Sequence, residues 1–474
     1  MSNPTEYEIA CGLDDRIEAA ITDGIRRGQM ETTRRSKQRR RRFTGVILTT
    51  VLLFTCMFTI KVSPVFAAMV REIPGLNKFV DLINNNTSDK GIQLALDNDF
   101  IQPVGVSDEH NGMKFTVQGI IADDSRMVVF YDIQLPDKDS SVELDDVSLT
   151  DTSGKKILAS LSYNNSDERK QEDIREFGIQ RGTIVVEITQ GKSLPSAVLL
   201  KVVFKKSPLS NLDNVKRDMF AGDGENLITK DNDRGTEFNV TIPIDREKFE
   251  GLQKEYIIGE TIQIEGQSIT FDKAVVSPLR ISLYVDYDKE NSKQIFGPGD
   301  IQLIDDQGTA WKSISGSMGS LKDRQILNFE SPYFKVPKTL TIEGSWFRAL
   351  NKDQMSVIID TEKGQLLKTP DEKLDLQGIE IIDKYLQLDF SLKGLDPADY
   401  MGYSLFEGEF TDADGNKHQR ENLKESTTSR FSDSGPIEQH NLQYMDNKTY
   451  KQPLTFTIFN YPAYIRERYK IRIK

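Results

Sequence analysis

One uncharged stretch near the N-terminus constrains this chain more than any other feature. Residues 43–60 contain no charged side chain. As a helix this stretch spans about 27 Å, which matches the thickness of a bilayer core. Apolar character resumes after Lys61 and continues to Val70, and the long Lys61 side chain can reach the polar interface. We therefore predict a transmembrane helix over residues 43–66 rather than a buried core helix.

A basic block fixes the orientation of this predicted span. Nine lysines and arginines lie between Arg26 and Arg42, opposed only by Glu31. The block ends in four consecutive arginines, Arg39, Arg40, Arg41 and Arg42. Positive residues flank membrane spans on the cytoplasmic side. The pattern predicts that residues 1–42 are cytoplasmic, that these arginines act as a topology signal, and that the rest of the chain is extracytoplasmic.

A cleaved signal peptide is the alternative to an anchor, because Ala67 and Ala68 offer small residues after the span. The long leading segment and the long apolar stretch favour an uncleaved anchor. Cysteine use is consistent with the predicted compartments, since Cys11 and Cys56 are the only cysteines in the chain and neither lies in the predicted extracytoplasmic region. The absence of disulfides from an extracytoplasmic region favours a bacterial surface, and it excludes a disulfide scaffold there.

The cytoplasmic segment contains an apolar stripe with helical spacing. Its members recur every fourth residue: Ile9, Leu13, Ile17, Ile21 and Ile25. A single amphipathic helix has no core of its own and is marginal in water. The stripe therefore predicts a binding surface, for which a partner protein is favoured over self-association. An unimportant tail remains the alternative.

Beyond about residue 88 the hydrophobic period becomes two, which is typical of half-buried strands. Met113, Phe115 and Val117 alternate with polar residues, and so do Leu386, Leu388 and Phe390. Three similar segments follow one another. Each has a strand that begins at a glycine (Gly112, Gly266, Gly378), then an Asp-x-x-Gly turn (Asp151, Asp305, Asp412), then a strand that follows a proline (Pro195, Pro337, Pro453).

This repeat predicts a mainly β protein with three tandem antiparallel β-sandwich-like, immunoglobulin-like domains. The expected order is a cytoplasmic helix and basic block (1–42), a transmembrane helix (43–66), a juxtamembrane segment (67–90), β domain 1 (91–212), a linker (213–235), β domain 2 (236–370) and β domain 3 (371–474).

Motifs for catalysis or metal binding are missing. The turn at Asp412 lacks the glycine and the final acid of an EF-hand loop, so we interpret the Asp-x-x-Gly sequences as hairpin turns. The three histidines have no metal-pair spacing, and there is no nucleotide-binding glycine loop. A net charge of −12 argues against nucleic-acid binding. We expect no enzymatic activity, no cofactor and no metal.

Several segments resemble a family of domain-of-unknown-function, single-pass membrane proteins of Gram-positive bacteria. They are residues 13–26 (LDDRIEAAITDGIR), 63–75 (SPVFAAMVREIPG) and 111–117 (NGMKFTV). Residues 266–279 look like a second uncharacterised, immunoglobulin-like domain that accompanies it. Members of the family are described as anti-sigma-like proteins encoded beside extracytoplasmic-function sigma factors. The zinc-binding His-x-x-x-Cys-x-x-Cys helix of better understood anti-sigma factors is absent here, so any inhibition would be metal-free.

The resemblance and the residue patterns lead to one functional expectation, a membrane-anchored regulator whose N-terminal helix binds a sigma factor. The rival is a cell-surface or adhesion protein whose outer domains bind an envelope ligand and whose N-terminus is only a topology signal. The sequence names neither the signal nor the ligand.

Overall fold

The computed structural model describes residues 89–163, 174–188, 195–208, 235–314, 319–321, 323–399, 404–421, 427–432 and 435–474. The described part is mainly β, as predicted, with six antiparallel sheets that form three facing pairs. The predictions for residues 1–88 concern a part of the chain that lies outside the described residues. Among the residues that the structure describes, no helix is both long enough and apolar enough to cross a membrane.

The first sheet pair follows helix α4 (Lys90–Asp97). One sheet has the order β1 (Gln102–His110), β2 (Met113–Ala122), β3 (Arg126–Gln134), β6 (Ile179–Ile188), β5 (Ala159–Tyr163). The other has the order β4 (Ser140–Asp151), β7 (Ala197–Pro208), β8 (Thr236–Pro243). The predicted alternation is confirmed in β2, where Phe115 and Val117 are fully buried. The ring of Phe115 packs against Phe204 and Phe238 of the facing sheet.

The second sheet pair begins after the short helix α7 (Arg246–Phe249). Its first sheet has the order β15 (Gly319–Leu321), β16 (Arg324–Phe329), β11 (Ile281–Tyr287), β10 (Gln267–Val276), β9 (Lys254–Ile264). The facing sheet contains β12 (Lys293–Pro298), β17 (Leu340–Asn351), β13 (Gln302–Asp305), β14 (Ala310–Trp311) and, paired with β17, β27 (Tyr464–Arg472). Both sheets contribute to one buried core that includes Phe271, Trp311 and Ile471.

The third sheet pair follows the 3-10 turn η1 (Lys352–Gln354). One sheet has the order β19 (Gln365–Lys368), β18 (Ser356–Asp360), β26 (Leu454–Ile458), β22 (Phe406–Thr411), β23 (Lys417–Gln419). The other has the order β20 (Leu374–Ile382), β21 (Tyr385–Lys393), β25 (Gly435–Asp446), β24 (Thr427–Ser432). Leu388 and Phe390 of β21 share a buried core with Phe456 of β26.

The three sequence segments occupy equivalent strands. Strands β2 and β10 begin directly after Gly112 and Gly266, but Gly378 lies inside β20, at its bulge, so the predicted start of that strand is wrong. Each of these three strands pairs with the strand that follows it. The Asp-x-x-Gly turns follow β4, β13 and β22, and the proline-led strands are β7, β17 and β26. In each pair the proline-led strand lies beside the strand that precedes the turn. The repeat in the sequence therefore corresponds to a repeat in topology.

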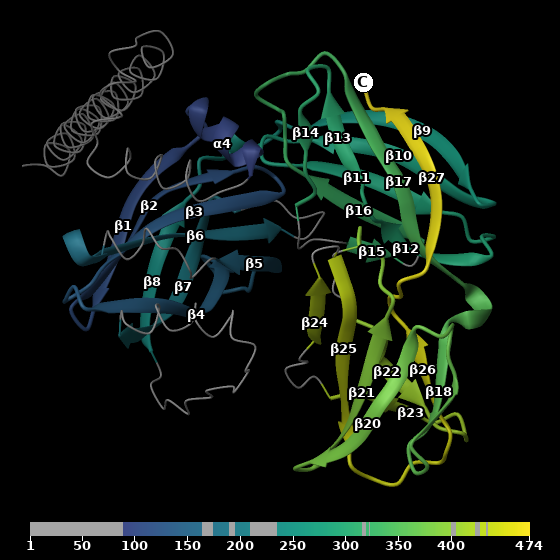
Figure 1. Ribbon diagram of the computed structural model, residues 1–474. Helices are drawn as coiled ribbons and strands as arrows, with labels where there is room; N and C mark the ends of the chain where they lie inside the picture. The colour runs from purple at the N-terminus through teal and green to yellow at the C-terminus, as the bar shows by residue number, and fades with distance from the viewer. Residues whose placement is uncertain are drawn as a thin grey trace, which may run out of the picture. The chain divides into compact units, whose positions relative to one another are not determined.

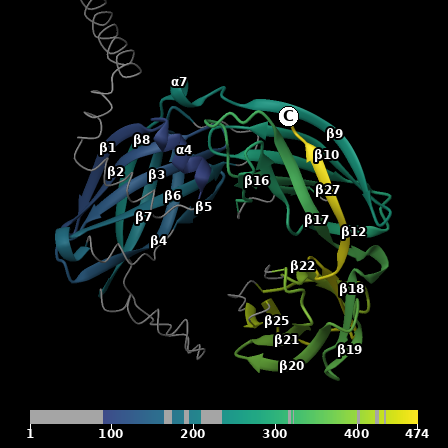
Figure 2. The same cartoon turned by 45° about the horizontal axis from the view of Figure 1, so that its top comes forward.

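Strand pairing places three segments on the other side of the predicted boundaries. Strand β8 pairs with β7 of the first sheet pair rather than opening the second. Strand β18 pairs with β26 of the third sheet pair, although the boundary at residue 371 would separate them. Strand β27 returns to β17 of the second pair, with Ile471 opposite Ile342. Figures 1 and 2 both show β27, in yellow, beside the green β17.

The third sheet pair is therefore inserted into the second instead of following it in tandem. Its chain enters after β17 and leaves before β27, so two connections join the two sheet pairs. The physical reason is closure of an edge. Each proline-led strand is covered on its second side, by β8, β27 and β18 respectively, and these covering strands come from different places in the chain. The order of the strands in the sequence does not reveal which strand covers each proline-led strand.

Candidate functional site

Helix α4 is the first described element after the predicted span, and its sequence fixes where it starts. Asp89 is the N-cap, and its carboxylate Oδ1 accepts hydrogen bonds from the backbone N–H groups of Gly91 and Ile92, at 2.9 and 3.2 Å. The buried face of the helix consists of Gly91, Ile92, Ala95 and Leu96. An eight-residue helix is unstable alone, so this packing holds it in place.

The helix and the residues after it contact both the first and the second sheet pairs. Leu94 packs against the core of the second pair. The ring of Phe100 lies 5.2 Å from the rings of both Phe249 and Phe334. At Gly91 there is no room for a side chain, because a Cβ would lie 2.8 Å from the backbone nitrogen of Ser331. Helix α4 is thus fitted closely between segments that are far apart in the sequence.

A chain of buried ion pairs joins α4 to the two sheet pairs. Arg126 Nη1 lies 2.6 Å from Asp89 Oδ2, and Arg126 Nε lies 2.9 Å from Glu187 Oε1. The second contact is an ion pair rather than a hydrogen bond, because the Nε–H is not aligned with a partner. Arg280 Nη1 lies 2.5 Å from the other oxygen of Glu187. Side chains of both arginines are only 5% exposed, so solvent screens these charges little.

Asp123 makes a second connection between the same two sheet pairs. Its Oδ1 accepts from the backbone N–H groups of Ser125 and Arg126, which fixes the turn between β2 and β3. Its Oδ2 accepts from Ser277 Oγ at 2.7 Å and from the Leu279 N–H at 2.9 Å. One buried carboxylate thus binds the turn after β2 to the turn between β10 and β11.

Lys90 and Glu330 attach the first turn of α4 to the second sheet pair. The Lys90 backbone N–H donates to Glu330 Oε1 at 3.1 Å, and Lys90 Nζ donates to the Ala310 carbonyl oxygen at 2.7 Å. The second oxygen of Glu330 accepts from the Lys312 N–H. We define the coupling cluster as four buried charged groups, Asp123, Arg126, Arg280 and Glu330, together with the partly buried carboxylates of Asp89 and Glu187. Within the described part of the chain, the cluster fixes the position of α4 relative to the first and second sheet pairs.

A polar pocket of about 230 Å³ lies next to the coupling cluster. Asp124 and Ser125 from the β2–β3 turn line one part of it, and Lys273, Arg280 and Tyr284 line another. The Nε of Arg280 is buried and makes no hydrogen bond within the described residues. Lys273 is paired with Glu255 at 2.8 Å. The pocket can hold several water molecules or a small polar ligand, so occupancy would affect the joint between the two sheet pairs.

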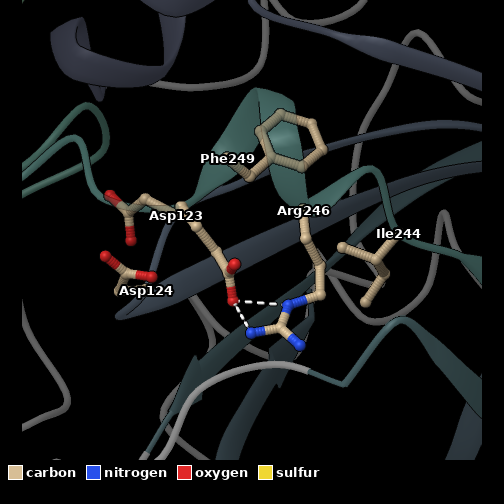
Figure 3. Close-up of a pocket in the computed structure, with 6 residues that line it drawn as sticks. Asp123, Asp124, Ile244, Arg246 and Phe249 are labelled. Carbon is tan, nitrogen blue, oxygen red and sulfur yellow. Dashed lines mark hydrogen bonds and ion pairs between the residues drawn. The ribbon is translucent and has the colours of Figure 1, made fainter.

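A smaller cavity of about 10 Å³, enough for one water molecule, lies on another side of the same turn. Figure 3 shows Arg246 paired with a carboxylate, Glu250, next to Asp123 and Asp124. Burial raises the pKa of the Asp124 carboxyl, and the neighbouring charges of Asp123 and Glu250 raise it further. Asp124 therefore takes up a proton more readily than an exposed aspartate.

The second and third sheet pairs are joined by another buried ion pair. Arg348 of β17 donates to Asp399 through Nε at 3.0 Å and through Nη2 at 2.6 Å. Tyr464 of β27 donates its hydroxyl to the same carboxylate at 3.0 Å. The Asp399 side chain is completely buried. The inserted third pair is thus held by a two-point ion pair as well as by two chain connections.

The sequence-predicted partner-binding residues Ile9, Leu13, Ile17, Ile21 and Ile25 and the topology signal Arg39, Arg40, Arg41 and Arg42 lie outside the described residues. The Asp-x-x-Gly sequences are hairpin turns with one shared geometry. Asp151, Asp305 and Asp412 each accept hydrogen bonds from the backbone N–H groups two and four residues later. The glycine of each turn has a positive φ, which explains the residue choice.

Each of the three histidines lies beside an aspartate rather than beside another histidine. The pairs are His110 with Asp108, His418 with Asp412, and His440 with Asp389. The His418 hydrogen bond lowers the pKa of Asp412 to about 2. The described ranges contain no group of three or more His, Cys, Asp or Glu side chains arranged to hold a metal ion.

Sequence reasoning missed the coupling cluster. Its members are separated by up to 241 positions and carry no motif spacing. One available signal was Arg280, a lone charge between Leu279 and the apolar strand β11. The turn sequence Asp123-Asp124-Ser125-Arg126 was another. Neither signal identifies a partner, because the contacts depend on how the strands return.

Two segments of the chain match models of known protein families. Residues 37–134 match a domain of unknown function (DUF4179), and residues 253–384 match a family of unknown function (DUF5643). No curated protein matches the chain. A solved structure described as the conserved domain protein from Bacillus anthracis is similar at 14% identity and a TM-score of 0.33, over 56% of this chain and 84% of that one. The chain thus contains two segments that are similar to families of unknown function, and its described part is mainly β.

Proposed function

We propose that this chain is a single-pass membrane regulator, with residues 1–42 in the cytoplasm, 43–66 in the membrane and the remainder outside the cell. In this proposal the apolar stripe of the N-terminal helix binds an extracytoplasmic-function sigma factor. The charge-free stretch, the arginine block and the resemblance described above support it. The match over residues 37–134 also supports it, because one matched segment contains the predicted span, α4, β1, β2 and β3.

The observation that carries the proposal is the attachment of α4. The predicted span ends at residue 66, and α4 begins at its cap, Asp89, which is held to the β domains by buried charges. Any change in the joint between the first and second sheet pairs must change the contacts of α4, because Arg126 and Glu330 belong to those two pairs. The coupling cluster is therefore a suitable place for an external event to reach the membrane segment.

The proposal includes no catalysis, no cofactor and no nucleic-acid binding, in line with the motifs and the net charge of −12. Release of the partner could follow cleavage of the stalk at residues 62–68, an idea that rests on its small residues and its position. Terminal tags would report intact and cleaved chain during envelope stress. An intact chain while the regulated genes turn on would rule out cleavage.

The stripe is tested by binding of residues 1–42 to the sigma factor encoded beside the gene, at two salt concentrations because the arginine block binds acids nonspecifically. We expect Ile17→Asp and Ile21→Asp to abolish binding. Thr22→Asp is the matched control, because it adds the same charge off the stripe. Binding that is lost at moderate salt, or that ignores the Ile substitutions, would contradict the proposal.

A surface-binding protein is the second candidate function, favoured by the polar pocket of about 230 Å³ beside the coupling cluster. In that case the N-terminal segment has no regulatory role. Deletion of residues 5–25 separates the two functions. Regulation requires that segment, whereas binding of an envelope ligand by the outer domains does not.

A further inference from the structure

In the part of the chain that the structure describes, the third sheet pair lacks a strand that the other two pairs possess. In the first pair the sheet runs β1-β2-β3-β6-β5, and in the second it runs β9-β10-β11-β16-β15. The corresponding sheet of the third pair runs β20-β21-β25-β24. Strand β20 corresponds to β2 and β10, which are covered by β1 and β9. Within the described residues no strand pairs with the outer edge of β20 (Figure 1).

This open edge is long and partly apolar. Strand β20 has nine residues, and at its end Ile381 and Ile382 are 64% and 42% exposed. The corresponding ends of β2 and β10 are buried at Ala122 and Val276. In a two-residue hairpin the closing pair, here Ile382 and Tyr385, is hydrogen-bonded, so Ile381 directs its N–H and C=O away from β21. Such unpaired groups on an edge are a template for another strand.

A β-bulge does not explain the open edge. Strand β20 has a bulge between Leu376 and Gly378, and bulges often protect edges. The sister strands β2 and β10 have bulges at the matching place, yet both are paired on their outer sides. The bulge is a shared feature of the three sheets that is compatible with a paired neighbour.

The charges on the sister strands indicate what kind of strand fits. Lys114 of β2 lies opposite Glu109 of β1, and Lys273 of β10 forms an ion pair with Glu255 of β9. The inner strand is basic at these places and the covering strand acidic. Strand β20 instead exposes two acidic side chains, Asp375 and Glu380, of which Asp375 lies 3.7 Å from Lys393 of β21. A covering strand for β20 therefore needs lysine or arginine, since opposite charges across strands stabilise pairing and like charges oppose it.

We propose that the outer edge of β20 binds, by strand addition, an extended segment of another protein in which apolar residues alternate with lysine or arginine. Backbone hydrogen bonds along the edge supply affinity, and the alternating side chains supply specificity. Apolar side chains of the added strand cover Ile379 and Ile381, as β1 and β9 cover the sister sheets. A second copy of β20 fits less well, because both strands would bring Asp375 and Glu380 to the interface. The inference does not depend on the regulatory role of the N-terminus.

The test uses the full chain in detergent micelles and two synthetic peptides based on the sister strand β9, residues 254–264. One peptide has the native sequence, and the other carries Glu255→Lys and Glu260→Lys. We expect the lysine peptide to bind about tenfold more tightly. In the register of β9 on β10, residue 255 lies opposite the place of Glu380 and residue 260 lies next to the place of Asp375, so both substitutions replace repulsion by attraction. Fluorescence anisotropy gives the dissociation constants, and hydrogen exchange should show added protection at β20. Equal affinity of the two peptides, or protection at β10 only, would overturn the proposal.

Two variants of the chain make the test independent of peptide behaviour. Ile381→Pro removes the outward N–H and should reduce binding at least about tenfold, because proline cannot donate to the added strand. Asp375→Lys combined with Glu380→Lys also removes the pair of Asp375 with Lys393 at 3.7 Å, but both side chains of that pair are more than half exposed, so the variant should fold, and it should reverse the preference toward the native peptide. An unchanged preference in this charge-swapped chain would refute the assigned chemistry. A dimer that Ile381→Pro dissociates would show that the edge is occupied by a second copy instead.

Discussion

Replacement of Arg126 by methionine is the sharpest test of the coupling cluster. Arg126 is the only residue of the cluster that touches both α4, through Asp89, and the first sheet pair, through Glu187. Arg126 Nη1 also donates a hydrogen bond to the Leu279 carbonyl oxygen of the second pair, at 3.3 Å. Methionine keeps the length and apolar volume of the side chain but removes its charge.

The magnitude follows from what the substitution leaves behind. Removing one partner of a buried ion pair costs about 3–5 kcal/mol, because the other charge stays buried without compensation. Glu187 keeps its contact with Arg280, and the Asp89 carboxylate keeps the N–H groups of Gly91 and Ile92. We therefore expect the low end, a loss of about 3 kcal/mol in the free energy that holds α4. This corresponds to an increase of about 100-fold in the opening equilibrium of the helix.

Amide hydrogen exchange measures this opening directly. The informative amides are those of Gln93 and Phe100, which donate to the carbonyl oxygens of Asp89 and Ala95. Arg246→Met is the matched control, because Arg246 forms an exposed ion pair with Glu250 in which its side chain is 47% exposed. Such exposed helical pairs contribute only about 0.3–0.5 kcal/mol, so exchange in α4 should not change in the control.

An Arg126→Met chain whose α4 amides exchange at the wild-type rate would refute the reasoning. A second comparison excludes a general loss of folding. Asp89→Asn keeps the helix cap, because asparagine caps as well as aspartate, but removes the ion pair with Arg126. If the ion pair holds the helix, the effects of Asp89→Asn and Arg126→Met will be less than additive.

Three further predictions concern other parts of the fold. Gly91→Ala should weaken the docking of α4 by about 1–3 kcal/mol, because the added Cβ meets the Ser331 backbone. This cost exceeds the gain from the better helix propensity of alanine, and hydrogen exchange of the α4 amides measures the net effect. Asp399→Asn should destabilise the joint of the second and third sheet pairs by about 3–5 kcal/mol, seen as faster proteolysis near residues 459–463; an unchanged cleavage rate would contradict it. The pKa of Asp412 is lowered to about 2, first by the hydrogen bond with His418 and further by hydrogen bonds from Asn416 and Asp414, so its contribution to stability is present above about pH 4 and is lost as the pH falls toward 2. His418→Phe should reduce this part of the pH dependence of unfolding, and an identical profile would count against the pair.

Local patterns in the sequence predicted local structure well. The alternation around Phe115 and Phe390 predicted strands because one face of each sheet is buried. The Asp-x-x-Gly turns at Asp151, Asp305 and Asp412 were predictable because a carboxylate that accepts nearby N–H groups and a glycine with positive φ are both local requirements.

Long-range features were not predictable from the same patterns. The pairing of β27 with β17 depends on a strand that returns after more than a hundred residues, and its sequence reads like any other edge strand. The coupling cluster has the same origin. Arg126, Glu187 and Arg280 are each unremarkable charges in the sequence, and only the fold buries them together. The missing strand beside β20 likewise becomes visible only when the three sheets are compared.

In the proposed function, the β domains control a cytoplasmic partner through α4 and the predicted membrane span. The most direct measurement is the fraction of the sigma factor that copurifies with full-length chain from membranes, compared between wild type, Arg126→Met and the control Arg246→Met. We expect Arg126→Met to change this fraction severalfold and Arg246→Met to leave it at the wild-type level. Equal copurification in all three chains, with α4 shown by hydrogen exchange to be released in Arg126→Met, would contradict the claim.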